Sequence, residues 1–223
     1  MNRTGRTISA FSLVGALVMG CGGSMKYTVD DAAMDPVPAS ERQGVFEARK
    51  DLEIAQGEKR TADSQLEALE RDRDIASKEK QQAQLEVEKA VAEQEGAKAS
   101  RNENQANAAA HNKDAADMGI KVAEAKMDWL DEKKDWLKQT RVAAEAHLQA
   151  ATARVELEKA KVAQQKGIKP SSDFNPSDFE GQWKSKNSDW QSEKKDADSD
   201  AKDVQDKEQR WKDLAAQLQK MKG

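Results

Sequence analysis

Proline, cysteine and aromatic residues are all scarce in this chain of 223 residues, and each scarcity excludes something. The sequence holds four prolines, one cysteine and 4% aromatic residues, and only 37% of its residues are apolar. An average soluble domain is about 45–50% apolar, so this chain cannot fill a thick globular core of its length. That disfavours most large enzyme folds. A single cysteine also excludes a disulfide within the chain.

The few prolines are placed in two pairs, Pro36 with Pro38 and Pro170 with Pro176. Because proline breaks the interior of a helix, its absence elsewhere leaves two long segments free to be helical, one between the pairs and one after the second. Proline alone therefore divides the chain into three parts.

The charge balance is mildly acidic, with 37 Lys and Arg against 41 Asp and Glu, a net charge of −4 and 35% charged residues in total. An acidic chain gains nothing from the counterion release that drives binding to nucleic acid. Nucleic acid is therefore not an expected partner.

The first residues, MNRTGRTISAFSLVGALVMGC, combine a basic start, an apolar stretch and a small residue before the cysteine. Arg3 and Arg6 supply the positive charge, and the apolar run 8–19 is too short to span a bilayer comfortably. This order is typical of a secretory signal peptide, which we place at residues 1–20.

The end of that peptide, Val18-Met19-Gly20-Cys21, resembles the lipobox of bacterial lipoproteins. The resemblance implies that Cys21 becomes the lipidated first residue of the mature protein, which leaves no free thiol. Two or three acyl chains anchor a protein stably to a membrane. Glycine rather than aspartate at position 22 implies, under the sorting rule of enteric lipoproteins, the outer membrane with the body facing the periplasm.

Residues 21–40 contain glycine, aspartate and two prolines without periodicity, and predict a lipidated, flexible tether. As a random coil it would hold the body about 25 Å from the acyl chains. Ser40 and Gln43 have the spacing of a capping box, which predicts that helix begins at residue 41.

A heptad pattern starts at Val45 and predicts an alanine-rich coiled coil over residues 41–167. Most a and d positions are apolar in one register, and alanine dominates the d positions. The pattern is weakest at 102–112, where asparagines cluster. Two arrangements stay open: a continuous helix of about 180 Å, or a bend at 102–112 between two antiparallel arms of about 80 Å.

The last part of the chain favours the bent form. Gly167 is typical of a helix end, residues 168–176 form a linker, and residues 177–223 predict a second helical unit. Apolar residues of this helix recur every seven positions: Trp183, Trp190, Ala197, Val204, Trp211 and Leu218. Folded back on the preceding arm, this helix places Trp211 near Trp129. We therefore predict an all-α fold of three long antiparallel helices, with one continuous rod plus a C-terminal helix as the alternative.

Three groups of residues are candidates for a site. The tryptophans could stack on a ligand, but their seven-residue spacing is what a packed helical seam requires. Asp196, Asp198 and Asp200 imitate the start of a calcium loop, yet the glycine and the glutamate of that loop are missing.

The third group, His111 with Asp114 and Asp117, offers three weak ligands in a solvated stretch. His147 has no partner evident from the sequence. No nucleophile elbow, phosphate loop or zinc-protease motif occurs. We expect no metal, no cofactor and no enzymatic activity.

The acylated, alanine-rich coil is loosely similar to murein lipoprotein, but it ends in Gly223 and not in the lysine that joins that family to the cell wall. The resemblance implies a structural spacer, scaffold or protein-docking element of the cell envelope, bound to the membrane by lipid and to proteins by coiled-coil surfaces. Two alternatives are a periplasmic adaptor-type hairpin docking on an export or efflux channel, and a lipoprotein that binds ligands through exposed tryptophan. The coil could also pair with a second copy.

Overall fold

A computed structural model describes residues 25–223 as three long helices and two short 3-10 helices. No strand occurs in the described part. The elements in chain order are η1 Asp31–Met34, η2 Ala39–Glu41, α1 Gln43–Ala99, α2 Glu103–Gln165 and α3 Pro176–Lys222.

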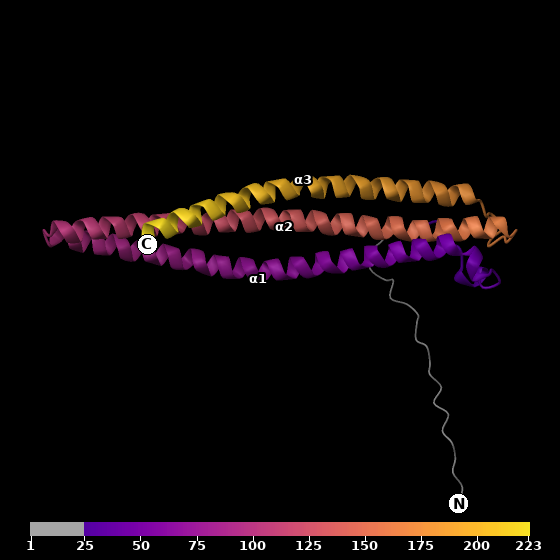
Figure 1. Cartoon of the computed structure of the whole chain (residues 1–223), viewed down its shortest axis with the longest axis horizontal. Coiled ribbons are helices and arrows are strands. Elements are labelled where there is room, and N and C mark those ends of the chain that lie inside the picture. Colours follow the sequence, from indigo (N-terminus) through magenta and orange to yellow (C-terminus); the bar gives the residue numbers. More distant parts are fainter. Residues whose placement is uncertain (1–24) are drawn as a thin grey trace, which may run out of the picture.

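The three helices are antiparallel neighbours, with α2 between α1 and α3 (Figure 1). Helix α1, with 57 residues, is about 85 Å long at 1.5 Å per residue. The all-α, three-helix prediction is confirmed. The continuous rod is excluded, because the chain reverses direction after α1. We call the end that holds residues 25–41 the base and the α1–α2 turn the tip.

The turn at the tip is three residues long. Arg101 adopts the left-handed backbone conformation (φ 54°), and the Asn102 side chain accepts a hydrogen bond from the Gln105 amide at 3.2 Å. Asn102 thus caps α2, as asparagine commonly does. The bend lies at the start of the expected stretch 102–112, and the rest of that stretch is helical because tertiary packing outweighs the weak helix propensity of asparagine.

Apart from Val45, which belongs to the core at the base, helix α1 buries one residue per heptad against α2. The buried stripe consists of alanines and one leucine: Ala48, Ala55, Ala62, Leu69, Ala76, Ala83 and Ala90. On α2 the facing residues include Leu130 and Leu137, each one position after an expected core tryptophan. The predicted register still holds in part of α2, where Ala125, Ala143 and Leu157 at its a and d positions are buried. Helix α2 also buries residues outside that register because it packs against two partners.

The tryptophans lie in the seam between α2 and α3. Trp129 and Trp211 stack with their ring centroids 4.9 Å apart, the pairing expected from the sequence. Ala197 and Val204 of the same stripe are buried. Large side chains on one helix fill the space beside small ones on the other, as close packing requires.

The segment before α1 corrects two expectations. Residues 25–41 form no flexible tether but pack against the base, and we call them the strap. Val29, Met34 and Val37 are at most 3% exposed and share a core with Phe179 of α3. The strap keeps an irregular course, as its two prolines favour, and burial of these apolar side chains holds it against the helices.

The expected capping box at Ser40 is absent. Ser40 belongs to η2, and α1 begins at Gln43 with Arg42 as its N-cap and no side-chain cap. The turn from α2 to α3 follows the sequence signals more closely. Gly167 has φ 65°, and the Ile168 amide donates to the Ala163 carbonyl at 2.8 Å, which is a Schellman motif.

Candidate functional site

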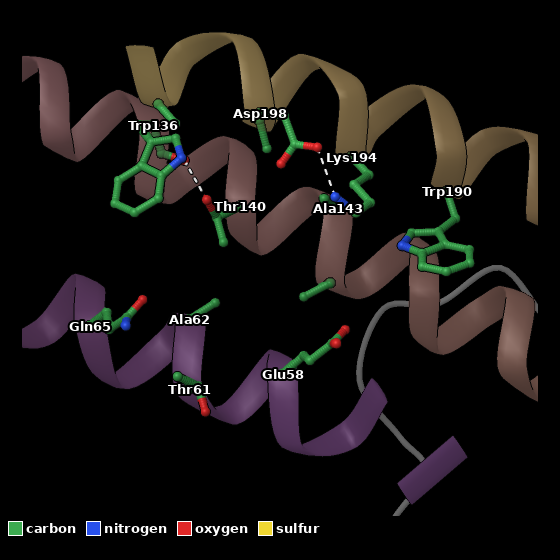
Figure 2. Close-up of a pocket in the computed structure, with 13 residues that line it drawn as sticks. Glu58, Thr61, Ala62, Gln65, Trp136, Thr140, Ala143, Trp190, Lys194 and Asp198 are labelled. Carbon is green, nitrogen blue, oxygen red and sulfur yellow. Dashed lines mark hydrogen bonds and ion pairs between the residues drawn. The ribbon is translucent and has the colours of Figure 1, made fainter. Parts of the chain in front are cut away.

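A pocket of about 420 Å³ opens where all three helices meet, and we call it the central pocket (Figure 2). Its apolar lining includes the alanines Ala62, Ala143, Ala144, Ala197 and Ala201 together with the indoles Trp136 and Trp190. The pocket exists because each helix presents alanine at this level. Methyl groups leave open the space that larger side chains fill elsewhere along the seams.

The two tryptophans bracket the alanine level. Trp136 comes from α2 and Trp190 from α3, on either side of the labelled alanines, while Glu58, Ala62 and Gln65 project toward the space from α1. The two indoles thus come from α2 and α3, while all three helices contribute polar groups to the lining. A pocket with this lining forms only when all three helices are packed together.

A buried histidine joins the three helices beside the pocket. His147 of α2 is 5% exposed, and its Nδ1 lies 2.6 Å from Glu58 Oε2 of α1. Its ring stacks on Trp190 of α3 with centroids 4.0 Å apart and planes 8° from parallel. Asp51 Oδ1 lies 3.8 Å from the other ring nitrogen. His147 therefore fixes both Glu58 and Trp190 in place.

Sequence reasoning found no partner for His147, and the reason is geometric. Cross-helix contacts join residues whose numbers total about 205, as Glu58 with His147 or Glu79 with Lys126 does. That relation follows from the turn at Arg101. The asparagine cluster indicated that a turn could lie within 102–112 but not at which residue. The exact position of the turn decides which α1 side chain lies opposite His147.

The polar rim of the pocket carries two carboxylates and one ammonium. Lys194 and Asp198, one turn apart on α3, pair at 2.7 Å. Glu58 is hydrogen-bonded to His147 through Oε2, and no protein contact engages Glu58 Oε1 in the described structure. The rim therefore has more hydrogen-bond acceptors than donors.

A second polar cluster fastens the strap to α2. Lys159 and Glu156 are 6% and 8% exposed and bind each other at 2.9 Å. Lys159 also donates to the Val29 carbonyl at 3.1 Å and meets Asp31 at 2.6 Å. The hydrogen bond from Lys159, and then the charges of Lys159 and Arg49, lower the pKa of Asp31. This cluster fastens the strap to the helices, and none of its residues lines the central pocket.

The remaining sequence candidates form no common site. Cys21, the expected lipidation site, lies outside the described residues. Asp117, considered with His111, pairs with Lys113 at 2.6 Å, and this hydrogen bond raises the pKa of Lys113. Within residues 25–223, no three histidine, cysteine or acidic side chains converge as a metal site would need.

Comparison with protein-family models, curated proteins and solved structures found no match. Among the residues that the structure describes, every helix is too polar or too short in its apolar runs to cross a bilayer.

Proposed function

We propose that this chain is a membrane-anchored coiled-coil lipoprotein, acting as a spacer, scaffold or protein-docking element of the bacterial cell envelope. The lipobox-like sequence ending at Cys21 supports the anchor, and outer-membrane attachment follows from the residue after it. The observation that carries the proposal is the docked strap. It joins the anchor region to one end of a long, narrow helical body.

The strap limits how far the body can lie from an anchor. Lys26 and Tyr27 donate their backbone amides to Gln182, near the start of α3, so the described chain begins at the base. Met25 follows Cys21 by four positions, and four steps of chain span at most about 14 Å. A lipid on Cys21 would hold the base close to the membrane and leave the tip about 85 Å from it along the helices.

A docking role at the tip is the second candidate. The C-terminal residues Met221 and Lys222 lie beside Glu86 and Lys89 of α1, so α3 ends before the tip does (Figure 1). Beyond that level only the α1–α2 hairpin continues. Adaptor-type lipoproteins dock on channels through such two-helix tips, and a photo-crosslinker at Asn104 would join a channel protein if this chain does the same.

The anchor is tested by Cys21→Ser. We expect this variant to leave the membrane fraction for the soluble envelope fraction and to lose incorporation of labelled palmitate. Ser24→Ala, three residues away, is the matched control and should stay in the membrane. Unchanged membrane retention of Cys21→Ser would refute the lipoprotein proposal, whatever the fate of the control.

A further inference from the structure

We propose that the central pocket binds a small organic cation with an apolar, ring-sized body. This inference goes beyond the envelope role and does not depend on it. It rests on the size of the pocket, on the two indoles in its walls and on the excess of carboxylate at its rim.

The pocket has the size and the lining of a ligand site. Its volume of about 420 Å³ falls within the range of about 300–1,000 Å³ that small-molecule sites occupy. Methyl groups of Ala143, Ala144 and Ala197, all at most 8% exposed, form an apolar surface without hydrogen-bonding groups. A ring-sized apolar body would cover these methyl groups and displace water from them.

The indoles favour a positive charge. The face of an indole carries negative electrostatic potential, and cations held over it gain about 0.5–2 kcal/mol, more as water is excluded. Both Trp136 and Trp190 line the pocket, from different helices (Figure 2). Trp190 stacks on His147, which lies about 16 Å along α2 from Trp136, so a ring-sized cation would contact one indole or the other.

The rim charges point the same way. Glu58 and Asp198 contribute two negative charges, and Lys194 contributes one positive charge that is already paired with Asp198. The lining thus carries one net negative charge, centred on Glu58. An anionic ligand would be repelled there, whereas a cation would be attracted to Glu58, whose side chain is about half exposed and is bonded to His147 through one oxygen.

His147 prepares the site without occupying it. It bonds Glu58 and stacks on Trp190, yet it is not among the residues that line the pocket. The carboxylate and one indole are therefore held in position before a ligand arrives. Such pre-organisation lowers the entropic cost of binding.

The test uses the full-length protein in a nonionic detergent and isothermal titration calorimetry. The probe is phenyltrimethylammonium, and N,N-dimethylaniline, uncharged at neutral pH, is its near-isosteric neutral counterpart; benzoate is the anion. We expect saturable binding of the cation, about tenfold weaker binding of the neutral analogue and none of benzoate. No binding of phenyltrimethylammonium, or equal affinity for this cation and for N,N-dimethylaniline, would overturn the proposal.

Two variants with matched controls locate the binding. Glu58→Gln should weaken cation binding about tenfold, whereas Glu79→Gln, three heptads along the same helix, should not change it. Ala201→Leu places a larger side chain in the pocket and should abolish binding, while Ala215→Leu, two heptads further on α3, should leave it intact. Circular dichroism confirms that each variant is folded. Retained binding in Ala201→Leu, or equal losses in a variant and its control, would refute this pocket as the site.

Discussion

Lys159 shows how a single side chain decides the form of a whole segment. A charged amine this deeply buried is tolerated only where its protons meet acceptors, and here Glu156, Asp31 and the Val29 carbonyl supply them. Glu156 in turn accepts the Val29 amide at 2.6 Å. Lys159 and Glu156 therefore bind the backbone carbonyl and the backbone amide of Val29. These two hydrogen bonds hold the irregular strap in place at this residue.

Replacing Lys159 by methionine tests this role. The change leaves Glu156 buried without its counter-charge, and removing one partner of a buried pair costs about 3–5 kcal/mol. We expect faster hydrogen exchange at the Val29 amide and a lower melting temperature, both measurable by exchange mass spectrometry and calorimetry. The control is Lys161→Met, since Lys161 is half exposed and pairs with Glu158; it should change stability by less than about 0.5 kcal/mol. Equal exchange rates in the two variants would contradict the role of Lys159.

At the scale of elements, the two turns differ in how well their residues suit them. Gly167 and Arg101 share the left-handed backbone conformation, with φ of 65° and 54°. Glycine adopts this conformation freely, whereas a side chain makes it cost about 1–2 kcal/mol. The α2–α3 turn is therefore relaxed, and the tip turn carries strain.

Arg101→Gly should relieve that strain. We expect the free energy of unfolding, measured in urea, to rise by about 0.5–1 kcal/mol, because relief of the strain exceeds the added freedom of the unfolded chain. The reciprocal variant Gly167→Ala should lower it by about 1 kcal/mol. A destabilised Arg101→Gly protein would show that the arginine side chain stabilises the turn in another way.

The helices themselves were predictable, and the strap was not. Heptad spacing and the paired prolines located the helical segments 41–167 and 177–223, and the asparagine cluster indicated a possible bend within the first of them. Folding the last helix back predicted the contact of Trp129 with Trp211. Val29, Met34 and Val37 follow no helical or strand period, so nothing local indicated that they would be buried. These side chains are buried against apolar residues that the three helices bring together at the base. That apolar surface exists only in the assembled fold.

The candidate site was beyond sequence reasoning for a related reason. The tryptophans were read as seam residues, and their place between α2 and α3 agrees with that. The central pocket, however, depends on alanines of three helices lying at one level, and the Glu58–His147 contact depends on the residue at which the chain turns. A shift of the turn by one helical turn would pair His147 with a different side chain.

At the scale of the molecule, the hairpin predicts a short distance between residues far apart in sequence. Spin labels at Gln81 and Glu124, in a Cys21→Ser background, should lie within about 30 Å, since packed helices are about 8–10 Å apart. A straight helix would separate the same positions by about 65 Å. The distance is measured by double electron–electron resonance.

Labels at Arg60 and Gln81 provide the control for that measurement. Both lie on α1, so they should be about 32 Å apart whether or not the chain folds back. A long Gln81–Glu124 distance together with the expected control distance would contradict the antiparallel arrangement in solution.

The course of the chain has a mechanical consequence. The strap lies at the base, whereas Gly223 lies some 70 Å away along α3, toward the tip (Figure 1). A force that pulls the two ends of the described chain apart acts along the helix axes and slides α3 against α2. All contacts of that seam, the Trp129–Trp211 stack included, then resist together in shear, whereas a sideways pull on α3 would break them one after another.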